Sequence, residues 1–173
     1  RISNNHRSCP LGWNSDVSRS NQEFENDMIS VSEVLSLASV FGRGGYKIAD
    51  IASVSKDEAT LMYLNRAYRK IATDAMPLEL IRTACDLEVD EPLIFLDNDV
   101  FIAMPKNIES ASDNIELDNS LLDCFVYCFL AVLNATPDEN SIYEIEYRKQ
   151  CDDYKVRTHN ARVAKFKKSF WLS

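Results

Sequence analysis

Two cysteines with helical spacing are the first residues that could perform chemistry. Cys124 and Cys128 lie four positions apart, so they share one face of a helix, as two ligands of a zinc ion can. Their neighbours are Phe, Val, Tyr and Leu, and no histidine or acidic pair completes a coordination shell nearby. Free cysteine is often fully buried, so packing in a core is the favoured interpretation. With Cys9, Cys85 and Cys151 scattered along the chain, we expect all five cysteines to be reduced thiols.

The histidines and a glycine-rich run offer little support for catalysis. His6 lies in a polar N-terminal segment and His159 in a basic stretch, and we expect both to be exposed. Residues 41–46 have the glycine content of a phosphate-binding loop. They follow a predicted helix rather than a strand and lack the GK[ST] ending, so the run predicts a helix end and a turn.

Acidic side chains are abundant but do not form a recognisable metal site. Asp97 and Asp99 begin like a calcium-binding loop, yet no glycine or twelfth-position glutamate follows in register. A second group comprises Asp86, Glu88, Asp90 and Glu91. Solvated strand ends and a turn account for both groups. The sequence therefore predicts no catalytic residue, cofactor, metal or small-molecule substrate, and favours a structural protein over an enzyme.

The most distinctive chemical feature is an uneven distribution of charge. Residues 1–147 carry 11 Lys and Arg against 25 Asp and Glu, a net charge of −14, whereas residues 148–173 carry 8 against 2, a net charge of +6. A basic helix can neutralise phosphates or an acidic protein surface, and an aromatic end can insert into a partner's pocket. A solvated helix face is the alternative interpretation. The residues predicted to bind a portal, a neighbouring subunit or nucleic acid are Arg148, Lys149, Lys155, Arg157, Arg162, Lys165, Lys167, Lys168, Phe170 and Trp171.

Length and composition predict one domain with a mobile arm. The 173 residues are 46% hydrophobic and 27% charged, which is typical of a globular chain. Residues 1–28 are rich in Asn, Ser and Arg and predict an extended arm. The sequence has no apolar stretch long enough for a membrane span and no signal-peptide pattern, so we expect synthesis in a cytoplasm and no membrane contact.

Four helices are predicted from apolar periodicity and capping residues. Capping-box spacing at Ser30 and at Ser55 begins the first two, which end at the glycine run and near Pro77. Asp118 or Asn119 caps the third, which is the most apolar segment and runs to residue 133. The fourth is one long helix after residue 137. Its buried side is predicted to carry Tyr143, Tyr147, Cys151, Tyr154, Ala161 and Phe166.

Between the second and third helices, alternating apolar residues predict strands. Residues 80–89 and the two apolar runs within residues 92–105 predict a β-hairpin or small three-stranded sheet at about residues 80–104. The predicted fold is therefore mainly α, a bundle of about four helices with this small sheet inserted after the second helix. It divides into the arm at 1–28, a core at 29–147, and a basic helix and tail at 148–173 that pack on the core and reach a partner.

Three segments carry a resemblance to a known family. The second helix contains the pattern L-x-x-L-N-x-A-x-x-x-I at residues 61–71, the β segment ends in FIAMPKNI at residues 101–108, and the last helix reads EIEYRKQCDDYKVRTHNA at residues 144–161. In this order the segments resemble the head–tail adaptor, or connector, proteins of tailed and especially short-tailed bacteriophages. The likeness covers residues 28–165. Residues 1–28 match nothing in that group.

The resemblance implies a structural role in the virion. Such proteins form a ring, usually of twelve copies, between the portal and the tail at the neck of the particle. DNA passes through the ring without sequence-specific contacts, tail proteins dock on it, and terminal segments reach the portal or a neighbouring subunit. A mostly acidic lumen would repel DNA and let it slide. The alternatives are a nucleic-acid-binding regulatory protein that uses the basic C-terminal helix, or another virion structural component.

Overall fold

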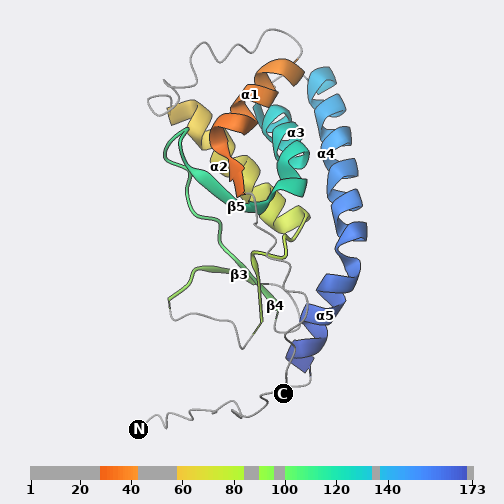
Figure 1. Ribbon diagram of the computed structural model, residues 1–173. Coiled ribbons are helices and arrows are strands. Elements are labelled where there is room, and N and C mark those ends of the chain that lie inside the picture. The colour runs from red at the N-terminus through yellow and green to blue at the C-terminus, as the bar shows by residue number, and fades with distance from the viewer. Residues whose placement is uncertain (1–27, 43–57, 84–89, 96–99, 134–136, 171–173) are drawn as a thin grey trace.

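The described residues form a helical bundle with two small antiparallel sheets (Figure 1). The computed structural model describes residues 28–42, 58–83, 90–95, 100–133 and 137–170. The predicted mainly helical fold with a small inserted sheet is confirmed. Its elements are β1 Met28–Ser30, α1 Val31–Phe41, α2 Glu58–Asp74, β2 Ile81–Thr83, β3 Leu93–Phe95, β4 Val100–Ala103, β5 Asn114–Asp118, a 3₁₀ turn Asn119–Leu121, α3 Leu122–Leu133, α4 Pro137–Arg157 and α5 His159–Phe170.

Helix α1 begins and ends close to where the sequence predicts. Ser30 is its N-cap residue, but the Ser30 hydroxyl bonds the hydroxyl of Ser32 at 2.7 Å and caps no backbone N–H, so the predicted capping box does not form. The helix stops at the glycine run, where the Gly42 N–H donates to the Ala38 carbonyl at 2.9 Å. The second predicted capping residue, Ser55, lies outside the described residues.

The core is built where α3 packs between α2 and α4 (Figure 1). Helix α2 buries a stripe at helical spacing that includes Leu64, Ala67 and Ile71, and α3 is buried on most of its surface around Phe125 and Phe129. Burying such side chains stabilises a fold by about 1.5–3 kcal/mol each. Helix α2 ends before Pro77 as predicted, through Met76 in a left-handed conformation with φ 47°.

The predicted sheet has three antiparallel strands in the order β2-β4-β3. Ile102 of the central strand lies opposite Ile81 on one side and Ile94 on the other. The turn expected at residues 97–99 lies outside the described residues.

A second, two-stranded sheet was not predicted. Strand β1 pairs antiparallel with β5, with Ile29 opposite Ile115 and a bulge between Met28 and Ile29. Met28, which the sequence places in the arm, is therefore the first residue of this sheet. The pairing holds the start of α1 beside Asp113, whose carbonyl accepts from the Val31 N–H at 3.1 Å. At the other end of β5, the Asp118 carboxylate accepts from the Ser120 N–H at 2.8 Å and caps the turn into α3, as predicted.

The predicted fourth helix is two helices that meet at Thr158. Backbone hydrogen bonds continue across the junction, from Thr158 to the Tyr154 carbonyl and from Arg162 to the Thr158 carbonyl, each at 2.9 Å. The Thr158 hydroxyl also donates to the Tyr154 carbonyl at 2.8 Å, a contact that often bends helices. Tyr143, Tyr147, Cys151 and Tyr154 are buried as predicted.

The change of direction at Thr158 alters which side of the last helix faces the core. Ala161, predicted to be buried, is exposed, and Arg162 is buried in its place. The side chain of Phe166 lies outside the described part of the chain. Within that part, no helix has the length and apolar character needed to cross a membrane.

Candidate functional site

Three of the predicted partner-binding residues are exposed on α4. Arg148 contacts Glu144 at 3.0 Å and Lys149 contacts Glu146 at 3.9 Å, while the Arg157 Nε reaches only the Asp153 carbonyl at 3.4 Å. Exposed ion pairs within one helix contribute about 0.3–0.5 kcal/mol each. These cations are thus held weakly and are open to an external partner.

Two other predicted residues, Arg162 and Lys165, contact this chain's own backbone. The Arg162 guanidinium donates to the Ala75 carbonyl and, at 2.9 Å, to the Thr158 hydroxyl, and it lies 5.5 Å from the centre of the Tyr154 ring. Lys165 Nζ donates to the Leu78 carbonyl at 2.8 Å. The carbonyls at a helix C-terminus carry partial negative charge, so Arg162 satisfies the end of α2 at Ala75, and Lys165 binds the turn that follows it.

The remaining basic and aromatic positions lie at the margin of the described chain. Lys155 is half-buried on α4. The backbone of Lys167, Lys168 and Phe170 belongs to α5, but their side chains lie outside the described residues, as does the whole of Trp171. The structure therefore brings Arg162 and Lys165 together at the end of α2 and leaves Arg148, Lys149 and Arg157 apart from them on α4.

The outer face of α4 carries exposed apolar side chains. Ile142, Ile145 and Val156 are 47%, 63% and 76% exposed, and Lys149 and Asp152 lie between them. Steps of three and four residues put all five on one face, opposite the face that enters the core. We call this set the α4 stripe. Apolar side chains grouped on one helix face are typical of a protein–protein contact.

A depression of about 630 Å³ lies beside the first half of α2. At its wall Asn65 holds the segment after β4: its amide oxygen accepts from the Ile108 N–H at 2.7 Å and its amide nitrogen donates to the Ile108 carbonyl at 2.9 Å. Two of the three segments that carry the family resemblance are thereby joined. The lining residues are Leu61, Met62, Asn65, Arg66, Arg69, Asn107, Ile108 and Glu109.

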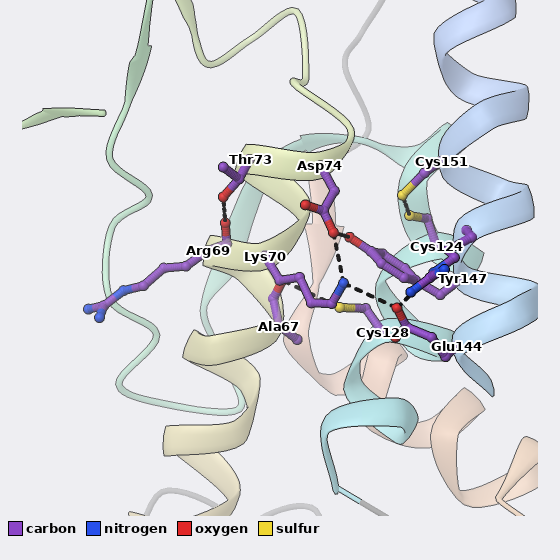
Figure 2. Close-up of polar contacts among 11 residues, drawn as sticks. Ala67, Arg69, Lys70, Thr73, Asp74, Cys124, Cys128, Glu144, Tyr147 and Cys151 are labelled. Atoms are coloured by element: carbon purple, nitrogen blue, oxygen red, sulfur yellow. Dashed lines mark hydrogen bonds and ion pairs between the residues drawn. The ribbon is translucent and has the colours of Figure 1, made fainter. Parts of the chain in front are cut away.

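A polar cluster ties the end of α2 to α4 (Figure 2). Asp74 Oδ2 accepts hydrogen bonds from Lys70 Nζ at 2.7 Å and from the Tyr147 hydroxyl at 2.8 Å. Lys70 Nζ lies 4.3 Å from the centre of the Tyr147 ring and 3.5 Å from Glu144, which also contacts Arg148. The charged members of the cluster are paired with one another, which is the arrangement expected of a network that stabilises the fold.

Burial and hydrogen bonding set the charge states in this cluster. Burial opposes ionisation of Asp74, but the hydrogen bonds from Lys70 and Tyr147 and the Lys70 charge outweigh it and lower the Asp74 pKa. Burial likewise opposes the charge of Lys70. The hydrogen bond to Asp74 and the negative charges of Asp74 and Glu144 outweigh burial and raise the Lys70 pKa. The pair is therefore ionised at neutral pH.

The three described cysteines are buried thiols, which confirms the predicted core packing of Cys124 and Cys128. Cys128 Sγ faces the Ala67 carbonyl at 3.7 Å. Cys124 points instead toward α4, where its Sγ lies 3.4 Å from Cys151 Sγ (Figure 2). This contact between Cys124 and Cys151 is not foreseeable from spacing alone.

The other predicted candidates lie mostly on the surface or outside the described chain. His159 is exposed, and Glu91 forms an ion pair with Arg82 at 3.0 Å. Asp90 occupies a turn with φ 71°, in keeping with the predicted strand end. Among the residues that the structure describes, no three His, Cys, Asp or Glu side chains are grouped so that they could hold a metal ion. The candidates that fall outside those residues are Cys9, Cys85, His6, Asp86, Glu88, Asp97, Asp99 and residues 43–46.

Comparison with known proteins finds no relative. No family model, no curated protein and no solved structure matches this chain.

Sequence reasoning missed the buried role of Arg162 and the double hydrogen bond of Asn65. The spacing of Lys70 and Asp74, one helical turn apart, was the available signal for the polar cluster. Neither Arg162 nor Asn65 had such a signal, because their acceptors lie 87 and 43 positions away in the chain.

Proposed function

We propose that this chain is a structural virion protein that forms a ring between the portal and the tail of a tailed bacteriophage. In that role it lets DNA pass and provides a platform on which tail proteins dock. The resemblance of residues 28–165 motivates the proposal. The observation that carries it is a pair of unlike surfaces, the α4 stripe and the depression beside α2.

A closed ring needs two different surfaces on each subunit. Its contacts are head-to-tail, so one surface of each copy meets another surface of the next. The end of α2 contacts α4 through Lys70 and Asp74. In Figure 1 the start of α2 and the middle of α4 lie at opposite sides of the bundle, with α3 between them. Surfaces placed in this way can join neighbours into a ring.

Shape and charge favour the pairing of these two surfaces. Ile142 and Ile145 project from the stripe, while Met62 and Leu61 offer apolar area in the depression. The stripe carries acidic Asp152 and basic Lys149, and the depression is lined by basic Arg66 and Arg69 and by acidic Glu109. Opposite charges at the edge of such a contact guide register and partner choice.

The basic residues on α4 and α5 then have separate uses. Arg162 and Lys165 fix α5 to the end of α2, so that α5 projects from the bundle in a defined direction. Arg148 and Arg157 remain for a portal or a neighbouring acidic surface, and Lys149 lies within the stripe. The net charge of −14 on residues 1–147 makes another copy a suitable acidic partner.

Native mass spectrometry and negative-stain imaging test the proposal on the chain alone and mixed with its portal protein. We expect symmetric rings, alone or on the portal. Ile145→Glu, which places a charge in the middle of the stripe, should abolish ring formation without unfolding the chain. Met104→Glu changes an exposed apolar side chain outside the stripe and is the matched control.

Two results would overturn the proposal or its surface assignment. A wild-type chain that stays monomeric in the presence of the portal rules out the ring. Rings that form equally well with Ile145→Glu rule out the α4 stripe as the contact.

A nucleic-acid-binding regulator is the second candidate, supported by the exposed cations on α4. It predicts binding whose affinity falls steeply with salt, roughly by one power of salt concentration for each phosphate neutralised. A gel-shift titration at several salt concentrations separates the two candidates. The internal use of Arg162 and Lys165 leaves fewer cations for this role.

A further inference from the structure

We infer that Cys124 and Cys151 are a redox modification site, a dithiol that a small neutral peroxide converts to a disulfide between α3 and α4. Their Sγ atoms lie 3.4 Å apart, in direct contact across the helix interface (Figure 2). A disulfide bond measures about 2.05 Å, so the sulfurs need to approach by little more than an ångström. This inference does not depend on the proposed function.

The surroundings distinguish the two sulfurs. The hydrogen bond from Cys124 lowers the pKa of Cys151, against the effect of burial, and the nearby Tyr147 hydroxyl acts in the same direction. The contact with Cys151, together with burial, raises the pKa of Cys124. Cys151 is therefore the more acidic thiol of the pair and supplies the nucleophilic thiolate, and Cys124 is the thiol that resolves it.

The reaction balances with hydrogen peroxide as oxidant. The Cys151 thiolate attacks one peroxide oxygen, the O–O bond breaks, and the hydroxide that leaves takes up a proton to give water, which leaves a sulfenic acid on Cys151. Cys124 sulfur then attacks the Cys151 sulfur. The S–O bond breaks, the Cys124 proton goes to the departing hydroxide, and a second water forms with the disulfide.

The neighbouring Cys128 provides an internal comparison. It lies one turn from Cys124 on the same helix and is equally buried, but its Sγ faces the Ala67 carbonyl at 3.7 Å instead of another sulfur. It has the burial of Cys124 without the sulfur contact. The contact between the two Sγ atoms, rather than any difference in exposure, therefore distinguishes Cys124 and Cys151 from Cys128.

The disulfide would fasten α4 to the core through a bond in addition to packing. Residues 124 and 151 are 27 positions apart, so the bond closes a loop that includes the connection between the helices. Closing a loop of this size restricts the unfolded chain. We expect the melting temperature to rise by about 5–10 °C on oxidation and to return on reduction.

The test treats the folded full-length chain with dilute hydrogen peroxide, followed by alkylation in denaturant and peptide mapping. We expect a loss of about 2 Da and a cross-linked pair of peptides that contain Cys124 and Cys151. A chain with Cys9 and Cys85 changed to serine keeps the assignment free of other thiols. In that background Cys128→Ala should still cross-link and Cys151→Ala should not.

Oxidised chains in which Cys124 and Cys151 both remain alkylatable would overturn the inference. So would a stable sulfinic acid on Cys151 without a cross-link. Since the peptide map is made on the wild-type thiols as well, the result does not depend on the folding of any variant.

Discussion

Helices α4 and α5 are almost continuous in the chain, yet they are attached to the molecule in different ways. The inner face of α4 buries tyrosine rings and a thiol, among them Tyr143, Tyr147 and Cys151, against α3 and the end of α2. Among the described side chains of α5, two cations donate to backbone carbonyls, Arg162 to Ala75 and Lys165 to Leu78.

The difference teaches which helix can move. Apolar burial is non-directional and is lost only when the core opens, whereas a few hydrogen bonds at a helix end can break one at a time. Helix α4 therefore belongs to the core, and we expect the attachment of α5 to open before that of α4. The following predictions test this contrast.

Tyr147→Ala should have the largest effect. It removes a fully buried ring and the hydrogen bond to Asp74, so we expect the free energy of unfolding to fall by about 3–5 kcal/mol. Urea unfolding measures this loss. Ile145→Ala on the exposed face of the same helix is the control and should cost about 0.5 kcal/mol or less. Similar costs for both would show that α4 is not part of the core.

Arg162→Met should detach α5 without unfolding α4. The change removes the charged donor to the Ala75 carbonyl, a loss of about 1.5–3 kcal/mol in local stability. Amide hydrogen exchange followed by mass spectrometry should become faster in α5 and stay unchanged in α4. Arg157→Met, which alters an exposed arginine on α4, should change neither rate. Faster exchange in both helices after Arg162→Met would contradict the contrast.

Acid should weaken the α4 attachment through Asp74. Since folding lowers the Asp74 pKa below its ordinary 3.8, its contribution to stability is complete above that pH and is lost as the pH falls through the folded-state value. Urea unfolding at several pH values should show a gap between wild type and Asp74→Asn that closes in acid. Asp153→Asn, at an exposed position on α4, is the control. A gap that stays constant with pH would exclude this role.

Glu79, which lies near Arg162 and Lys165, should show a pH response opposite to that of Asp74 and the smallest effect of the four. Burial raises its pKa above the ordinary 4.5, and its Oε2 is buried with no hydrogen-bond partner in the described structure. Its ionised form therefore opposes folding at neutral pH and ceases to do so as the pH falls through the folded-state value. Glu79→Gln should raise the melting temperature slightly at pH 7, and this advantage should fade as the pH falls through the folded-state pKa and be gone below about pH 4.5. A loss of stability at pH 7 would contradict the effect.

Much of the fold was predictable, because the spacing of apolar residues in the longer helices shows which face of each helix is buried. The stripe through Leu64 and Ile71 and the apolar run around Phe125 identified α2 and α3 from sequence. Strands β1 and β5 have only three and five residues, and their pairing joins positions far apart in the chain. Alternation over so few residues carries little information.

The candidate site was predictable only in part, for a related reason. Exposure of Arg148 and Lys149 follows from charge. The same rule misplaces Arg162, whose burial depends on a carbonyl at the end of α2 that only the folded chain brings near. The bend at Thr158 could not be predicted, because no proline or glycine lies there and backbone hydrogen bonds continue through it.

The bend at Thr158 also makes α5 a lever. Its 12 residues span about 18 Å at 1.5 Å per residue. A change of about 10° at Thr158 would move the far end of α5 by about 3 Å while its near end stays in place. Small adjustments at one threonine can therefore reposition the basic C-terminus against a partner without disturbing the packed face of α4.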